Sequence, residues 1–145
     1  MNLNGKIIIL LDSFAKTEAQ AALTAFSEAG GDSSAVIVAP ITEKVAEQNT
    51  AEAAEAVAAG HWPGGVPRTG KKRSALIAGA DKRNAVALMR CFRSILPADA
   101  DSAFAMVTET GRSWTVDGYL AHIRKEHEFM KSADPSQDPD MREVD

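Results

Sequence analysis

Short runs of apolar residues alternate along the chain with longer segments in which apolar residues recur every three or four positions. The first run, residues 7–11, contains only isoleucine and leucine and predicts a strand that is buried on both faces. The next segment carries Ala22, Leu23 and Phe26 at helical spacing and ends at a pair of glycines, as helices commonly do. The first half therefore predicts a strand at 7–11, a helix at 15–29, a strand at 35–39 and a helix at 50–59 capped by Thr50.

The same order of elements recurs after a segment rich in glycine and proline. The pattern predicts a strand at 74–78, a helix that Asp81 caps and Pro97 ends, a strand at 103–107 and a last helix from about Thr115. A shift of 66 residues places Leu10 on Leu76, Ala22 on Leu88 and Phe26 on Phe92, and a shift of 68 places Val36 on Phe104 and Val38 on Met106. This match indicates an internal repeat, although similar patterning of two unrelated halves would produce it as well.

Strands that alternate with helices favour a layered fold with a mainly parallel sheet. We expect an α/β protein in which two tandem β-α-β-α units pack as one α/β sandwich around a four-stranded, largely parallel sheet. Residues 1–131 would form a single domain made of two pseudo-repeats, about 1–60 and 74–131, joined by a Gly/Pro/basic linker at 61–73. Residues 132–145 are polar, acidic and contain proline, and are expected to be a disordered tail. The order of the strands stays open.

The second half contains four short segments with recognisable motifs, among them W-T-V and E-H-E-F-M: Leu76–Gly79, Ala105–Glu109, Trp114–Val116 and Glu126–Met130. Through these residues the second half resembles a small prokaryotic domain family of unknown function. The resemblance covers about residues 75–130. It implies a strand, helix, strand and helix in that order, and it implies no activity, substrate or cofactor.

Charge is distributed unevenly along a chain of otherwise ordinary composition. The 145 residues are 45% hydrophobic and 25% charged, which disfavours a disordered or membrane-embedded chain, and the formal net charge is -4. Residues 66–95 nevertheless carry eight basic side chains and a single acidic one, between two acidic flanks. No apolar stretch is long enough for a signal peptide or a membrane span, and Cys91 is the only cysteine, so a cytoplasmic location is expected.

The basic linker is the main candidate for a binding surface. Arg68, Lys71, Lys72 and Arg73 would bind an acidic protein partner or an anionic small molecule, with Trp62 as a contact residue. The alternative is self-pairing, in which acidic residues of the tail lie over the same loop. Nucleic acid is disfavoured because the sequence pI is about 5.4 and no aromatic residues interleave with the cations. We therefore expect a regulatory or scaffolding module, and the oligomeric state stays open.

A small α/β enzyme is the alternative function. Asp12, Asp81 and Glu109 follow predicted strands, and the carboxyl ends of parallel strands meet at one crevice where ligands bind. Asp12 and Asp81 could form a carboxylate pair there, although helix capping and turn formation explain such residues equally well. The sequence has no nucleophile elbow and no dinucleotide fingerprint, so we lean against catalysis and expect no cofactor.

Four further features have simpler structural explanations. Residues 65–72 nearly spell a phosphate-binding loop, but Lys72 replaces the required hydroxyl and no strand precedes the loop. His122 and His127 are five residues apart, so they point to different faces of a helix and only His122 and Glu126 share one; no metal site is expected. Cys91 lies beside an apolar stripe and is expected to pack as a small hydrophobe. Trp114 precedes the last helix and is expected to pack on Tyr119 or Leu120.

Overall fold

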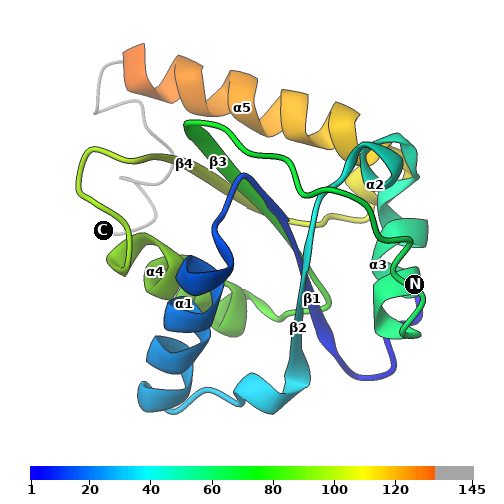
Figure 1. The fold of residues 1–145 in the computed structure, drawn as a ribbon, viewed down its shortest axis with the longest axis horizontal. Coiled ribbons are helices and arrows are strands. Elements are labelled where there is room, and N and C mark those ends of the chain that lie inside the picture. Colours follow the sequence, from blue (N-terminus) through cyan, green and yellow to red (C-terminus); the bar gives the residue numbers. More distant parts are fainter. Residues whose placement is uncertain (133–145) are drawn as a thin grey trace.

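Four strands form one sheet in the order β2-β1-β3-β4. The fold comes from a computed structural model that describes residues 1–132 (Figure 1). The strands are β1 (Ile7–Asp12), β2 (Val36–Pro40), β3 (Lys72–Ala78) and β4 (Asp101–Met106). The β1/β2 and β3/β4 pairs are parallel, as expected for most of the sheet, whereas the central β1/β3 pair is antiparallel. The expected tail lies outside the described residues, apart from Ser132.

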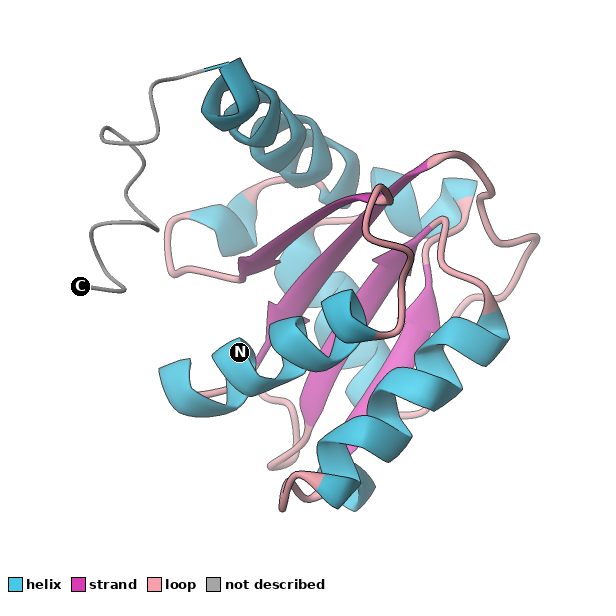
Figure 2. Cartoon of the chain, turned by 90° about the vertical axis from the view of Figure 1, so that its left-hand side faces the viewer, coloured by secondary structure: helices cyan, strands magenta, loops and turns pink. Residues whose placement is uncertain are grey.

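The helices form a layer on each side of this sheet (Figure 2). One face is covered by α1 (Lys16–Glu28) and α4 (Lys82–Ser94), and the other by α3 (Thr50–Ala58) and α5 (Val116–Ser132). A short helix, α2 (Glu43–Glu47), and two 3-10 turns, η1 (Ser33–Ala35) and η2 (Gly111–Ser113), complete the described chain. No helix of the described part is long and apolar enough to cross a membrane.

The apolar run of β1 is continuous because both of its faces are buried. Ile7, Ile9 and Leu11 pack in the core cluster beneath α1 and α4, whereas Ile8 and Leu10 pack in the cluster beneath α3 and α5. Successive side chains of a strand point to opposite faces, so a strand between two helical layers needs apolar residues at every position. The sequence pattern of this strand is therefore explained by the two-sided packing.

The two halves of the chain have equivalent elements 66 residues apart. We call β1, α1, β2 and α3 the first unit, and β3, α4, β4 and α5 the second unit. Helices α1 and α4 begin at residues 16 and 82 and end at residues 28 and 94. Leu10 pairs with Ala39 in the first unit, and Leu76 pairs with Ala105 in the second, so the offset of 66 holds in the outer strands as well. The shift of 68 expected for those strands is wrong, because strand register fixes a single offset.

The two units face each other across an approximate twofold axis. Leu10 of β1 pairs with Leu76 of β3, which is its own equivalent. A second pairing of equivalents joins the helix starts, where the Thr50 N–H donates to the Trp114 carbonyl and the Val116 N–H donates to the Gln48 carbonyl, both at 2.8 Å. The cap of α3 is Asn49 rather than Thr50, because the Asn49 Oδ1 accepts from two backbone N–H groups while the Thr50 hydroxyl is buried and donates to the Trp114 carbonyl.

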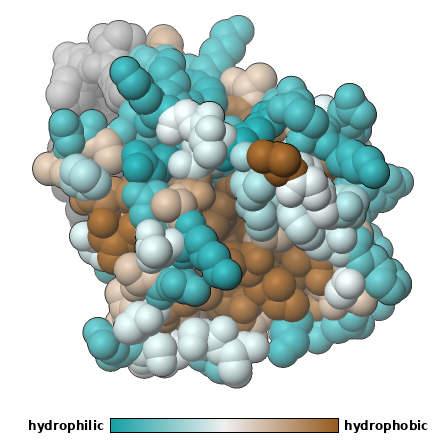
Figure 3. All heavy atoms as spheres, viewed as in Figure 1, coloured by the Kyte–Doolittle hydropathy of each residue, from teal (hydrophilic) through white to brown (hydrophobic). Residues whose placement is uncertain are grey.

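The outer edge of β2 is apolar and only partly covered. Ile37 and Val38 are half-buried, and apolar side chains gather in the lower centre of Figure 3, where β2 runs as the edge strand of the sheet. Pro40 ends the strand and has no N–H to offer to a further strand. This proline is one of the devices that keep sheet edges from pairing with other chains.

Candidate functional site

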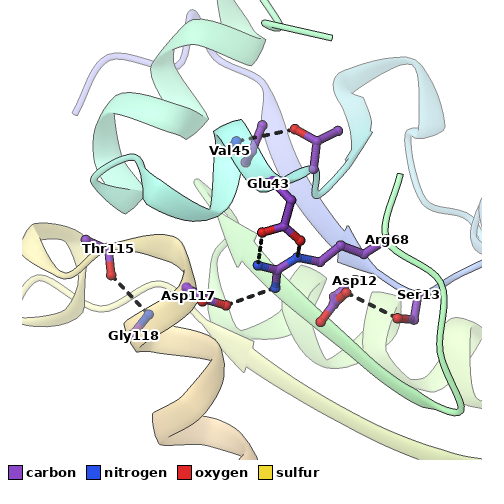
Figure 4. A network of polar contacts seen from close by, with 9 residues as sticks. Asp12, Ser13, Glu43, Val45, Arg68, Thr115, Asp117 and Gly118 are labelled. Atoms are coloured by element: carbon purple, nitrogen blue, oxygen red, sulfur yellow. Dashed lines mark hydrogen bonds and ion pairs between the residues drawn. The ribbon is translucent and has the colours of Figure 1, made fainter. Parts of the chain in front are cut away.

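The linker between the units crosses the carboxyl ends of β1 and β2. The Arg68 N–H donates to the Ile41 carbonyl at 3.0 Å, which fixes the linker backbone to the residue after β2. The Arg68 side chain then contacts two carboxylates, with Nε 3.0 Å from Glu43 Oε1 and Nη1 2.9 Å from Asp117 Oδ1 (Figure 4). The hydrogen bonds that Arg68 donates to these two carboxylates, the one to Asp117 first, raise the pKa of the guanidinium. Arg68 therefore joins α2, α5 and the linker.

Asp12 and Ser13 lie beside this network at the end of β1. Burial raises the pKa of the Asp12 carboxyl, against the lowering effects of the Ser13 hydroxyl bond and of Arg68 and Arg124. The Ser13 hydroxyl donates to Asp12 Oδ1 at 3.2 Å, and Ser13 has a φ of 68°, in a region that non-glycine residues rarely adopt. The equivalent position in the second unit is Gly79, with a φ of 82°. A perturbed carboxyl and a strained residue thus adjoin at one strand end.

Two more of the expected linker cations are also paired. Arg73 lies within β3, and its Nη2 is 2.9 Å from Glu18 Oε2 in a half-buried pair. Lys72 Nζ is 3.8 Å from Glu128 Oε1. Lys71 is exposed and has no ion pair within residues 1–132. The linker is therefore a less available anion site than its sequence indicates.

Trp62, the expected contact residue, is used inside the fold. Its Nε1–H donates to the Pro40 carbonyl at 3.3 Å, and its ring packs against the core cluster beneath α3 and α5. Trp62 thus anchors the linker to the end of β2.

The expected carboxylate pair is not assembled. Asp12 is the last residue of β1 and pairs with Ser74 near the start of β3, whereas Asp81 follows the opposite end of β3. The expectation of a single crevice is wrong. Strands β1 and β3 are antiparallel, so their carboxyl ends point toward opposite ends of the sheet. Asp81 caps α4 by accepting from the Asn84 N–H at 2.8 Å, and Glu109 is exposed in the turn after β4.

The remaining candidates have structural partners. His122 Nε2 is 2.9 Å from Glu126 Oε1 on the same helix face, and Trp114 packs edge-on to Tyr119 with ring centroids 5.1 Å apart. His127 Nε2 lies 3.2 Å from Asp101 Oδ1. Within residues 1–132 no group of three or more His, Cys, Asp or Glu side chains could hold a metal ion.

Cys91, the only cysteine, lies on the buried face of α4, and burial raises the pKa of its thiol. A raised thiol pKa leaves little of the nucleophilic thiolate at neutral pH. Cys91 therefore has the environment of a residue that packs in the core rather than that of a nucleophile.

The outer face of α4 is the surface that sequence reasoning undervalued. Four of its side chains are exposed cations without a carboxylate partner among residues 1–132: Lys82, Arg83, Arg90 and Arg93. The Arg93 guanidinium lies 4.9 Å from the centroid of the Phe104 ring. Helix α4 contains no acidic residue. The signal was present in the basic segment 66–95, but charge density along the chain does not reveal which cations are paired.

Fold and surface together define a small three-layer α/β protein in which one face of α4 carries cations without a carboxylate partner among residues 1–132. Residues 73–130, which form nearly all of the second unit, match the family model of DUF3783, a domain of unknown function. This match covers the half of the chain for which a resemblance was expected. No curated protein and no solved structure gave a significant match to the chain.

Proposed function

We propose that this protein is a regulatory or scaffolding module that binds an acidic partner through the outer face of α4. The observation that supports the proposal is the contrast between paired and unpaired cations. Arg68, Lys72 and Arg73 each contact a carboxylate of the fold, whereas the α4 cations have none among residues 1–132. An unpaired cation on a folded surface retains its field for a partner.

The arrangement of these cations favours an extended acidic partner. At 100° per residue, Lys82, Arg83, Arg90 and Arg93 fall within about 100° of arc on one side of the helix. They span roughly 16 Å along its axis at 1.5 Å per residue. A row of this length suits an acidic protein segment better than a single small anion. Nucleic acid stays disfavoured, because exposed aromatic residues for base stacking do not accompany the cations on α4.

The test compares two sets of charge-neutralising variants. A blocked oligoglutamate peptide is titrated into the wild-type protein and into the variant with Lys82, Arg83, Arg90 and Arg93 changed to Gln. We expect binding that weakens with salt in the wild type and disappears in the variant. The control changes Lys71 and Lys72 to Gln in the linker and should reduce binding only slightly. If the linker variant lost binding and the α4 variant did not, the linker cations rather than the α4 cations would form the binding site.

A small α/β enzyme is the second candidate, because Asp12 and Ser13 have the properties of a reactive site. A carboxyl with a raised pKa beside a strained residue at a strand end is typical of active sites. Turnover of a screened substrate that is lost in Asp12→Asn with the fold intact would favour this function. Turnover that survives the change would remove Asp12 from consideration.

We also infer that the two units are copies of one domain, and that the protein is cytoplasmic. The shared offset of 66 in helix bounds and strand registers supports the repeat. The single free cysteine supports a reducing compartment. A profile built from the second unit should align to residues 7–58 at that offset, and alignment at other offsets would argue against common descent.

A further inference from the structure

A pocket opens where β3 ends and α4 begins. Its volume is about 420 Å³, within the range of small-molecule sites. The buried part of its lining is apolar and includes Ile7 and Phe26, which are 9% and 2% exposed. Gly79 and Ala80 form the wall contributed by the turn before α4. The pocket therefore has an aromatic ring at its base and small residues at its side.

On the other side of the twofold axis an aromatic side chain occupies the equivalent place between the two units. The offset of 66 makes Phe14 the equivalent of Ala80, and Phe92 the equivalent of Phe26. The Phe14 ring packs edge-on to Phe92, with centroids 5.4 Å apart and planes at 81°. Edge-to-face packing at this separation is a favourable arrangement of two rings. Position 80 carries only a methyl group, so no ring packs on Phe26 from this side, and Phe26 itself is 2% exposed.

A second pair of equivalent positions enlarges the space further. Arg73 of the second unit and Glu18 of the first form a half-buried ion pair, and their equivalents Ile7 and Asn84 both line the pocket. Isoleucine is shorter than arginine, and Asn84 is shorter than glutamate. The pocket thus results from smaller side chains on a shared backbone.

Two glycines near the pocket allow the backbone to pack closely against its neighbours. A Cβ on Gly79 would lie 2.7 Å from Leu3 Cδ1 and 2.8 Å from the Lys6 carbonyl oxygen, so the turn is tight against the N-terminal segment. A Cβ on Gly31 would collide with the Phe26 ring. Glycines at these places allow the close approach that holds the ring of Phe26 at the base.

The exposed part of the lining offers hydrogen-bond acceptors. Asp32 and Asp81 line the pocket and accept from the backbone N–H groups of Ser34 and Asn84, which leaves further acceptor positions on each carboxylate. Lys6 Nζ bonds the Ser34 carbonyl at 3.3 Å and lies close enough to Asp32 to offset part of its charge. This environment suits an uncharged ligand that donates a hydrogen bond.

We propose that the pocket binds an aromatic ring that carries a hydrogen-bond donor, as a phenol does. The ring packs edge-on to Phe26, as Phe14 packs on Phe92, and the hydroxyl donates to the Asp81 carboxylate. A free small phenol and the tyrosine side chain of a partner share this chemistry. The site is separate from the cationic face of α4 and does not depend on the function proposed above.

The test uses p-cresol and its methyl ether, 4-methylanisole, in titrations followed by amide NMR shifts of the full chain. We expect p-cresol to shift the amides of Gly79, Ala80 and Asp81 with a Kd of about 1 mM, a value that a ligand of this size can reach. The ether lacks the donor and should bind about tenfold more weakly, because hydrogen bonds to charged groups are strong. A blocked Gly-Tyr-Gly peptide that binds more tightly than p-cresol identifies a partner segment as the source, whereas weaker binding identifies a free phenol.

Variants locate the binding. Ala80→Phe fills the space and should abolish the shifts, whereas the control Ala21→Phe adds the same ring to the exposed face of α1 and should leave them unchanged. Asp81→Asn keeps a good helix cap but removes the charge, and should reduce the preference for p-cresol over the ether. Ring–ring nuclear Overhauser effects between p-cresol and Phe26 support the site even if Ala80→Phe is unstable. No shifts at the solubility limit of p-cresol, or equal binding by the ether, would overturn the proposal.

Discussion

Filling the pocket at Ala80 should stabilise the protein, because the first unit already accommodates a phenyl ring in the equivalent place. Ala80→Phe adds a ring beside Phe26, where a pocket of about 420 Å³ opens. Ala80 is half-buried, so only part of the new side chain would leave water.

The size of the effect follows from the area that the ring buries. A phenylalanine that enters the pocket by half removes roughly 100 Å² of apolar surface from water, or about 2.5 kcal/mol at 25 cal/mol per Å². Fixing the side-chain rotamer costs about 1 kcal/mol. The free energy of unfolding should then rise by about 1.5 kcal/mol, which corresponds to a Tm increase of about 3–6 °C for a chain of this length.

Thermal unfolding followed by circular dichroism measures the change, with Ala21→Phe as the control. Ala21 is exposed on α1, and an added ring there should alter the free energy of unfolding by less than about 0.5 kcal/mol. The reverse change, Phe14→Ala, opens the first unit's space and should lower the Tm. A lower Tm in Ala80→Phe, with Phe14→Ala also destabilising, would show that the two spaces are not equivalent and would refute the reasoning.

Three further predictions concern the buried and paired groups. Arg68→Ala should lower the free energy of unfolding by about 1 kcal/mol in urea titrations, because its carboxylate partners Glu43 and Asp117 are mostly exposed; a loss above about 3 kcal/mol would contradict this. Asp12→Asn should raise the Tm at pH 7, because the folded state disfavours the charged carboxyl. That gain should vanish as the pH falls below the ordinary pKa, where Asp12 is protonated both folded and unfolded, and a gain that persists at low pH would rule out charge burial as its cause. Cys91 should react slowly with a thiol reagent in the native protein and rapidly in urea, and equal rates would show that the thiol is accessible.

The elements were predictable because each is controlled by local pattern. The strand at 7–11 and the helix at 15–29 were found almost to the residue, since apolar runs and glycine stops are properties of the segment itself. Helix α2 was missed because it is only five residues long. Its start depends on the buried Thr42, whose hydroxyl accepts from the Val45 N–H at 3.3 Å. So short a helix carries too few turns to show a period.

The direction of the central strand pair was not predictable from pattern. Both β1 and β3 are apolar on two faces in either a parallel or an antiparallel arrangement, so nothing in their side chains distinguishes the two. An all-parallel sheet would place Asp81 at the same end of the strands as Asp12. In the antiparallel arrangement the two residues lie at opposite ends, so the expected carboxylate pair does not form. Contacts between distant segments, such as Thr50 with Trp114, determine the arrangement, and no local signal reports them.

Because equivalent residues of the two units are 66 positions apart, the side chains at equivalent positions can be compared directly. Where two units share a backbone, a position occupied by a large residue in one and a small residue in the other marks a place that only one unit fills. Phe14 and Ala80 differ in this way, and so do Arg73 and Ile7. Both differences fall around the same pocket, with Ala80 and Ile7 lining it. The pocket is formed by residues of both units and opens on the side of the twofold axis where Ala80 and Ile7 lie. On the other side Phe14 packs on Phe92, and this ring indicates what the pocket can hold.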